Sequence, residues 1–214
     1  MNRTIAIGDI HGCSQALAVL LDAIAPTADD TLVLLGDYVD RGPDSHGVLE
    51  EIIGLQSRCR VVPLVGNHEL MMLAVQDGQM PSIFWERYGG LETLVSYNGS
   101  LKGVRDAHWE FLRMCRRYHE TDTHIFMHAN YIADRDMADQ PDQTLFWTHI
   151  TSVTPPPHRS GKTAIVGHTP QIGGDILDLG HLKCIDTCCF GGGWLTAYEV
   201  HTGQHWQAHQ NGKC

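Results

Sequence analysis

The chain has 214 residues, which is enough for one domain with a sizeable core. Hydrophobic residues make up 43% and charged residues 19%, shares that are ordinary for a globular protein and argue against disorder. The formal net charge of −10 opposes nonspecific binding to nucleic acid or to an anionic membrane, because those polyanions attract clusters of Lys and Arg. We therefore expect a single domain over residues 1–214, with no nucleic-acid or membrane partner; the oligomeric state is left open.

The cysteines and the beginning of the chain indicate a compartment. The seven cysteines are an odd number, are scattered and form no CxxC pair, so a disulfide scaffold is not expected. The first apolar run is too short for a signal peptide. No stretch approaches the roughly 20 apolar residues that span a bilayer. Together these features predict a cytoplasmic protein.

The first part of the chain alternates short apolar runs with amphipathic stretches. Residues 4–7 predict a strand, and residues 15–25 predict a helix with Ser14 as its N-cap. Residues 31–35 form a continuous apolar run, which is typical of a strand buried on both faces. This alternation favours an α/β domain.

A second helix and a third strand continue the pattern. Pro43 predicts the start of a helix that reaches about Leu55. Residues 60–65 predict a strand in which Pro63 indicates an edge position or a bulge.

The rest of the chain changes character twice. Residues 70–118 are predicted to be rich in helix, with breaks at two glycine-containing turns. Strands are predicted at 124–127 and 163–166, on either side of a polar surface loop that contains three consecutive prolines. The end predicts antiparallel strands at 181–185, 194–200 and 204–208, with Thr202-Gly203 as a hairpin turn.

Three loops share one design: each follows a predicted strand, opens with glycine and carries carboxylate, imidazole or amide groups. They are Gly8-Asp9-Ile10-His11-Gly12, Gly36-Asp37-Tyr38-Val39-Asp40-Arg41-Gly42 and Gly66-Asn67-His68-Glu69. Because the carboxyl ends of neighbouring strands face one crevice, we expect the loops to converge there, together with His128 and His168 at later strand ends. A single strand-end Asp or His can equally cap a loop, but the repetition at five strand ends favours a metal site.

The D-x-H, G-D-x-x-D-R and G-N-H-E motifs, with His128 and His168, resemble the phosphoprotein phosphatase branch of the calcineurin-like metallophosphoesterases, of the bacterial serine/threonine protein phosphatase type. The resemblance covers nearly the whole chain, and the segment from Ile185 to Ala197 is similar to the closing segment of small bacterial members. It implies an α/β fold of two packed mixed β-sheets flanked by helices, a four-layer αββα sandwich. Two metal ions would lie at one edge.

The resemblance also implies a ligand set and a cofactor. Asp37 would bridge two divalent ions and would hold them roughly 3.5–4 Å apart. The favoured metal is Mn²⁺, with Fe or Zn²⁺ as alternatives. The implied metal ligands are Asp9, His11, Asp37, Asn67, His128 and His168.

The implied reaction is hydrolysis of phosphate monoesters by a hydroxide that bridges the metals, with phosphoserine or phosphothreonine in a phosphoprotein or phosphopeptide as substrate. His68 would be the general acid, oriented by Asp40. Arg41 would bind phosphate oxygens, for which its planar guanidinium is well suited. Asn67 would contact the substrate as well as a metal.

The sequence departs from the family pattern in three places. His128-Ala129-Asn130 stands where a His-Gly-Gly motif is usual, and Cys188 stands where glycine is common. A second phosphate-binding arginine is missing after Trp147. His149 could replace it when protonated, or be a plain surface histidine; Arg135 and Arg159 are further candidates.

Two other readings are possible. A symmetrical dinucleoside polyphosphate hydrolase of the same fold would act on a nucleotide, but those enzymes tend to lack the equivalent of Asp40 and to have Asp in place of Glu69. A noncatalytic binding protein with structural metals would be favoured by loss of Asp40, Arg41 or His68, and all three are present. Trp85 is expected to pack in the core. Glu69 could either orient the site or serve the start of its helix.

Overall fold

A computed structural model describes residues 2–213. Cys214, one of the seven cysteines, lies outside the described residues, and the other six are free thiols.

Within residues 2–213, ten strands form two five-stranded sheets. The first sheet contains β1 (Thr4–Ile7), β2 (Thr31–Leu34), β3 (Arg60–Pro63), β9 (Trp194–Glu199) and β10 (His205–His209). Its order is β10-β9-β1-β2-β3, parallel from β1 to β3 and antiparallel at β9 and β10. Both sheets are therefore mixed, because the second combines parallel and antiparallel pairs as well.

The second sheet contains β4 (Tyr118–Glu120), β5 (His124–Met127), β6 (Thr163–Val166), β7 (Leu177–Asp178) and β8 (Leu182–Cys184). Its order is β4-β5-β6-β8-β7, with β5, β6 and β8 parallel and the two edge strands antiparallel.

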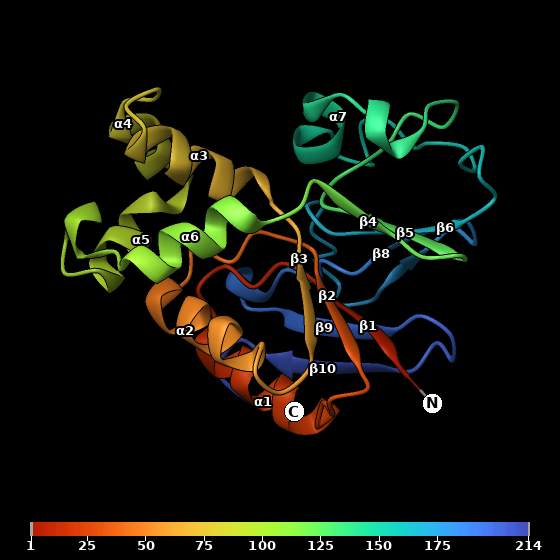
Figure 1. Ribbon diagram of the computed structural model, residues 1–214, viewed down its shortest axis with the longest axis horizontal. Coiled ribbons are helices and arrows are strands. Elements are labelled where there is room, and N and C mark those ends of the chain that lie inside the picture. Colours follow the sequence, from red (N-terminus) through yellow and green to blue (C-terminus); the bar gives the residue numbers. More distant parts are fainter. Residues whose placement is uncertain (1, 214) are drawn as a thin grey trace.

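Helices flank the sheets, and most of them belong to the first half of the chain (Figure 1). They are α1 (Ser14–Ile24), α2 (Ser45–Leu55), α3 (Asn67–Gln76), α4 (Ser82–Trp85), α5 (Leu91–Ser96), α6 (Asp106–Met114) and α7 (Asp142–Trp147). Short helical turns are η1 (Glu86–Gly90), η2 (Leu101–Gly103), η3 (Met137–Asp139) and η4 (Cys189–Gly191).

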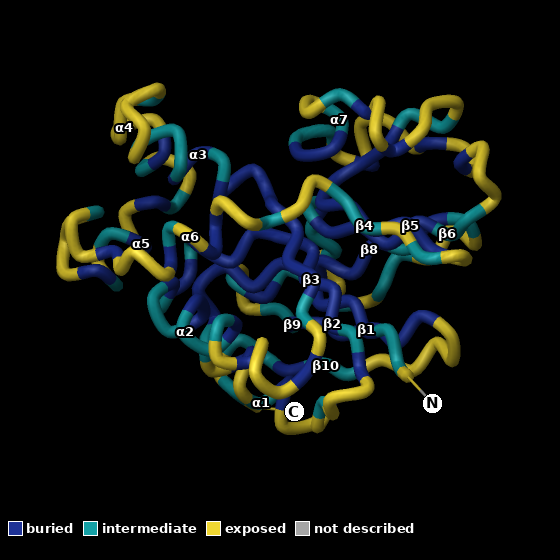
Figure 2. The backbone as a smooth tube through the Cα atoms, in the orientation of Figure 1, coloured by how far each residue is buried: buried dark blue, intermediate teal, exposed yellow. Residues whose placement is uncertain are grey.

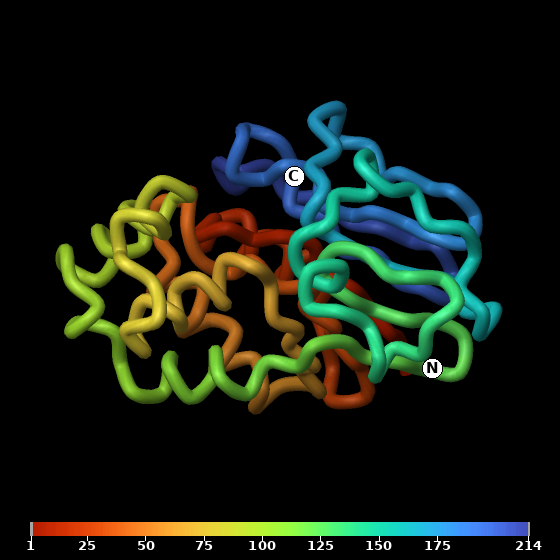
Figure 3. The backbone as a smooth tube through the Cα atoms, turned by 90° about the horizontal axis from the view of Figure 1, so that it is seen from above, coloured from red at the N-terminus to blue at the C-terminus, as the bar shows by residue number. Residues whose placement is uncertain are grey.

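The core is layered because side chains alternate across each strand. Ala6 of β1 and Ile165 of β6 belong to the apolar cluster between the sheets. Ile5 belongs instead to the cluster under α1, α2 and α6. On the second sheet, Ile125 packs against α7 and the adjoining loops. Figure 3 shows the two sheets stacked on one side of the molecule. The predicted αββα sandwich is confirmed.

Most predicted elements are confirmed, including the strands at 4–7, 124–127 and 163–166. Pro63 lies in an edge strand, as predicted. Ser14 as an N-cap is wrong, because it is the first helical residue and Cys13 takes the cap position. The second helix begins at Ser45 rather than Pro43, since the Asp44 side chain accepts a hydrogen bond from Gly47 N and caps it.

The prediction for the end of the chain is correct for β9 and β10, which are antiparallel. It is only partly correct for β8, which lies in the other sheet and pairs antiparallel with β7 but parallel with β6. The three-residue β4 and two-residue β7 are too short to leave a sequence pattern.

The central strands and the loops at their carboxyl ends are buried, whereas α4, α5 and η1 carry much exposed chain (Figure 2). Across residues 2–213 there is no helix with the length and apolar content needed to cross a membrane.

Candidate active site

The candidate site is built from the loops that follow β1, β2 and β3 and from the ends of β5 and β6. Of the eight non-glycine residues with positive φ among those described, five are predicted site residues: His11, Asp37, Asp40, Arg41 and His168. Left-handed backbone is uncommon outside glycine and persists only where neighbours hold it. The fold therefore maintains a costly backbone where these side chains meet.

Asp37 lies at the centre of the site and is almost completely buried. Its Oδ2 lies 3.4 Å from His11 Nε2, 3.4 Å from His128 Nε2 and 4.0 Å from His68 Nε2. Burial opposes ionisation of this carboxyl, but the surrounding imidazoles outweigh it and lower its pKa below the usual range. An ionised, central carboxylate is what two metal ions would share.

His128, Asn67 and His168 form one side of the site. His128 Nδ1 donates to Leu35 O at 2.9 Å, so the lone pair of the neutral ring is on Nε2. Burial keeps the ring neutral by lowering its pKa. This Nε2 lies 2.9 Å from Asn67 Oδ1 and 3.2 Å from His168 Nδ1. Nε2 and Oδ1 are both acceptors, and a cation between them would satisfy both.

His11 forms the other side. Its Nδ1 donates to Val39 O at 2.9 Å, which leaves the lone pair on Nε2. Arg41 Nη1 lies 3.0 Å from that nitrogen. Burial lowers the pKa of His11 well below its usual value, so the ring is neutral and able to bind a metal ion.

Asp9 is placed differently from the other predicted ligands. Among residues 2–213, side-chain atoms that could bind a metal gather within 4.8 Å of one another in two sets at this site, His11–Asp37–His68 and Asp37–His128–His168, and Asp9 belongs to neither. Its carboxylate accepts the His168 backbone N–H at 3.2 and 3.0 Å.

Asp9 and Asp186 form an acidic part of the site. Burial, with Asp186 and Asp37 nearby, raises the pKa of Asp9 well above its usual value. Burial also raises the pKa of Asp186 to about 6. Added positive charge would allow both to ionise. Asp186 is not among the ligands that the motifs imply. Its position just after β8, at a strand end like the predicted site residues, is the sequence feature that could have identified it.

The donor set fits divalent cations. Among residues 2–213, two buried side-chain nitrogens have no hydrogen-bond partner, His68 Nε2 and His168 Nε2, and both belong to this site. Buried polar atoms without partners are rare in folded proteins and indicate a binding or catalytic role. The ligand roles of the six predicted residues stay predictions.

His68 and Asp40 are held as a pair. His68 Nδ1 lies 2.7 Å from Asp40 Oδ2, and Trp85 Nε1 donates to the same oxygen at 2.7 Å. Thr93 Oγ1 donates to Asp40 Oδ1 at 2.7 Å and accepts the Asp40 backbone N–H at 2.8 Å. Trp85 thus packs in the core, as expected, and also positions Asp40.

Glu69 clamps two of the loops together. One carboxylate oxygen accepts the Gly66 and Asp37 backbone N–H groups at 2.9 and 2.8 Å, and the other accepts those of Tyr38 and Val39 at 2.8 and 3.3 Å. Both readings of Glu69 are therefore correct, because it starts its helix and orients the neighbouring loop.

The candidates to replace the missing arginine lie in different places, and their roles stay predictions. His149 is exposed and its ring lies 4.3 Å from that of His168, so it borders the site without contacting Arg41. Arg159 is engaged with Asp134 O and with Asp136. Arg135 lies between these two aspartates in the sequence and is exposed.

The departures at 129, 130 and 188 have structural reasons. Neither Ala129 nor Asn130 has a positive φ, so glycine is not required there. Asn130 is buried and holds the loop by donating to Val153 O at 2.8 Å. Cys188 has φ of 60°, the conformation that favours the glycine common at this position.

A third group of potential ligands, His46, Glu50 and His108, lies on α2 and α6. Glu50 there contacts Arg105 and lies 2.8 Å from His108 Nε2. These contacts account for the group, which connects the two helices.

Two stacked mixed sheets with candidate metal ligands gathered at one edge are typical of a metallophosphoesterase. A family model described as calcineurin-like phosphoesterase matches residues 3–198, and the chain belongs to this family. It is thus a hydrolase of the metallophosphoesterase class.

Known proteins similar to this chain differ in substrate. The symmetrical bis(5′-nucleosyl)-tetraphosphatase of Burkholderia pseudomallei is 46% identical over 74 residues, which are 35% of this chain. The chain spans about a quarter of the length of these curated relatives, 26%. A crystal structure provisionally assigned as a diadenosine tetraphosphatase has TM-score 0.71 and 23% identity, covering 97% of this chain and 93% of that one. The cold-active protein-tyrosine phosphatase of a psychrophilic Shewanella has TM-score 0.72 and 18% identity, covering 100% and 79%. The two structures show a common fold.

Proposed function

We propose that this chain hydrolyses dinucleoside polyphosphates at a dimetal site. The observation that carries the proposal is the 46% identity over 74 residues to symmetrical bis(5′-nucleosyl)-tetraphosphatases, in a chain whose candidate ligand atoms gather around Asp37. Symmetrical cleavage of a dinucleoside tetraphosphate consumes one water and yields two nucleoside diphosphates.

The chain's own residues supply binding and proton transfer. His11, Asp37, Asn67, His128 and His168, with Asp9 nearby, would hold two divalent ions. Such ions, when bound, supply Lewis-acid activation of water and of phosphoryl oxygens. Arg41 binds phosphate oxygens through its planar guanidinium.

His68 moves the proton. Burial opposes a charge on its ring, but the carboxylates of Asp37 and Asp40 outweigh burial and raise the pKa of His68. Its unpartnered Nε2 is free to donate to the departing oxygen, while Asp40 fixes Nδ1.

A phosphoprotein phosphatase, of the serine/threonine type, is the second candidate, and the Asp40–His68 pair favours it. A serine or threonine alkoxide leaves poorly unless it is protonated, whereas a nucleoside diphosphate leaves as a stable anion. A buried, carboxylate-oriented imidazole is therefore of greater use to a phosphomonoesterase.

One comparison separates the candidates. The Mn²⁺-reconstituted protein is assayed on a symmetrical dinucleoside tetraphosphate, a phosphoserine peptide and a phosphotyrosine peptide. We expect the highest kcat/KM on the dinucleoside tetraphosphate, with nucleoside diphosphate as the only product. A higher value on the phosphoserine peptide would replace the first proposal with the second. The highest value on the phosphotyrosine peptide, or no turnover of any of the three substrates, would overturn both.

A further inference from the structure

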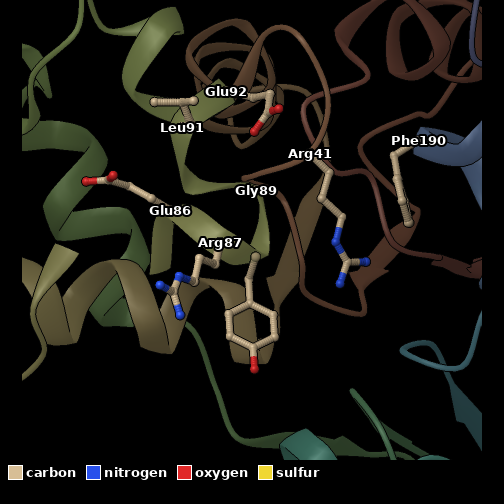
Figure 4. A pocket seen from close by; sticks show the side chains of 8 residues that line it. Arg41, Glu86, Arg87, Gly89, Leu91, Glu92 and Phe190 are labelled. Atoms are coloured by element: carbon tan, nitrogen blue, oxygen red, sulfur yellow. The ribbon is translucent and has the colours of Figure 1, made fainter. Parts of the chain in front are cut away.

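An open pocket of about 490 Å³ adjoins the catalytic loops on the side of Arg41. Its walls come from η1, from the start of α5 and from η4 near the end of the chain (Figure 4). The lining residues are Arg41, Glu86, Arg87, Tyr88, Gly89, Leu91, Glu92 and Phe190. None of them except Arg41 has a role in the proposed chemistry.

The pocket is fixed rigidly to the site through Gly89. The Arg41 backbone N–H donates to Gly89 O at 3.0 Å. Gly89 has φ of 105°, and a Cβ there would lie 2.6 Å from Arg41 Cγ and 2.7 Å from Arg41 N. Only glycine permits this approach. Arg87 and Tyr88, which immediately precede Gly89, are thereby held at a set position relative to Arg41.

Two guanidinium groups line the pocket. Figure 4 shows the side chains of Arg41 and Arg87 on either side of it. Arg87 is exposed and forms no ion pair with any residue from 2 to 213. Its charge is available to a ligand, and arginine is the side chain best suited to phosphate oxygens.

Two aromatic rings complete the pocket. Tyr88 is 57% exposed, a large fraction for an aromatic side chain that serves no packing role. The Phe190 ring lies 4.5 Å from the Arg41 guanidinium, which links it to the phosphate side. Phe190 is partly buried against the core, whereas the Tyr88 ring is exposed. An exposed ring beside cationic groups is a combination that binds a nucleobase together with its phosphates.

We propose that this pocket binds the nucleoside diphosphate portion of the substrate that becomes the leaving group. Arg87 acts as the second phosphate-binding arginine, and Tyr88 and Phe190 stack on the base. Glu86 and Glu92, at the same pocket, accept hydrogen bonds from the amino group of the base and disfavour placing further phosphates there. This inference rests on the proposed function, because it names a subsite for that substrate.

The test uses inhibition, so that it does not require turnover of a dinucleotide. ADP and inorganic pyrophosphate are compared as inhibitors of p-nitrophenyl phosphate hydrolysis by the metal-loaded full chain. The two compounds share a diphosphate, and only ADP carries a base. We expect ADP to inhibit more strongly than pyrophosphate by about tenfold or more, because a stacked base contributes binding energy of that order. Tyr88→Ala should remove that advantage.

Arg87→Ala should weaken inhibition by ADP and inhibition by pyrophosphate to the same extent, by about tenfold or more. The reason is that the substitution removes a charged hydrogen bond to phosphate. Arg58→Ala is the matched control, because Arg58 is an exposed arginine outside the pocket, and it should change neither inhibition constant.

Equal inhibition by ADP and pyrophosphate in the wild type would overturn the base subsite, as would an ADP advantage that survives Tyr88→Ala. Inhibition unaffected by Arg87→Ala would overturn the phosphate role of Arg87. If instead the inhibition behaves as expected but no dinucleoside polyphosphate is hydrolysed, the pocket stands as a nucleotide site and the proposed function fails.

Discussion

At the scale of single residues, His68 is the side chain whose chemistry is set most directly by its neighbours. Asp40 lies 2.7 Å from Nδ1, and Nε2 has no partner within residues 2–213. The carboxylates raise its pKa against the effect of burial. A protonated imidazole with a free N–H at the reaction centre is arranged to protonate a leaving group.

His68→Asn should therefore harm a substrate in proportion to its need for a proton. We expect kcat on phenyl phosphate to fall by about 10²–10⁴. The loss on p-nitrophenyl phosphate should be clearly smaller, because p-nitrophenolate departs unprotonated. Asp40→Asn should show the same selectivity, whereas Arg41→Ala should lower kcat on both substrates by the same factor. Metal content is measured in each variant, and equal losses in a fully metallated His68→Asn protein would remove the general-acid role.

Glu69 gives a second residue-scale prediction. Its carboxylate accepts four backbone N–H groups from two loops. In Glu69→Gln one oxygen becomes an amide NH₂ that faces N–H donors. We expect the free energy of unfolding to fall by about 1–3 kcal/mol. Urea denaturation measures this, with the exposed Glu110→Gln of α6 as the matched control. Equal stability of the two variants would show that the clamp contributes little.

Site residues were predictable from sequence only where they follow a strand within a recognisable motif. Asp9 and Asp37 follow the parallel neighbours β1 and β2, and His128 and His168 follow the parallel neighbours β5 and β6, so the closeness within each pair followed from the parallel order of the strands. That the two pairs meet depends on how the two sheets stack. Trp85 and Thr93 contact Asp40 although they lie 45 and 53 positions away in the sequence. No local sequence pattern predicts such a contact. The Glu69 clamp likewise depends on how two loops meet.

At the scale of elements, one ion pair joins the start of β1 to the end of α1 and to the start of β2. Arg3 Nη1 and Nη2 donate to the carbonyls of Ile24 and Ala25 at 3.2 and 3.3 Å, which satisfies the free end of α1. The same guanidinium binds the buried Asp30 carboxylate at 2.6 Å. Thr27 N–H also donates to Asp30, at 2.8 Å.

Asp30→Asn should lower the free energy of unfolding at pH 7 by about 1–3 kcal/mol. The hydrogen bond from Arg3 lowers the pKa of Asp30 below its ordinary value. A depressed carboxyl pKa adds stability that is complete above the unfolded-state pKa of about 4 and is lost as the pH falls through the folded-state pKa. The difference between wild type and variant should thus be constant from pH 7 to 5 and shrink below about pH 4.

Urea denaturation at several pH values checks this linkage. Asp29→Asn is the matched control, because Asp29 is exposed and adjacent. A difference that grows on acidification would contradict the assigned direction of the pKa shift.

The elements themselves were largely predictable because apolar periodicity reports burial. β1, β2 and β6 are buried on both faces and read as continuous apolar runs. Boundaries were less predictable. Pro43 suits a first turn, but the Asp44 cap sets the start of α2 two residues further on, at Ser45. The partner of β8 could not be read from its own sequence, because a three-residue strand carries no information on direction.

At the scale of the whole molecule, three apolar clusters in the described part of the chain hold the layers together. One joins the first sheet to α1, α2 and α6, one lies between the sheets, and one joins the second sheet to α7. The site lies at the edge where the two sheets meet, so it depends on the layers more than they depend on it. A core of this extent distinguishes the chain from small zinc domains, whose folding free energy is that of the metal.

Chelation should therefore inactivate the protein without unfolding it. We expect EDTA to abolish turnover and to leave the far-UV circular dichroism nearly unchanged, with activity restored by Mn²⁺. The Tm should still fall on chelation, because a metal that binds only the native state at 100 times its Kd adds about 2.7 kcal/mol. Asp37→Asn is the informative control: without the shared carboxylate, its Tm should respond little to EDTA or to Mn²⁺. Loss of secondary structure on chelation at room temperature would show that the metals are structural and that the apolar layers are insufficient alone. An Asp37→Asn protein whose Tm still rises strongly with Mn²⁺ would place the stabilising ion away from Asp37.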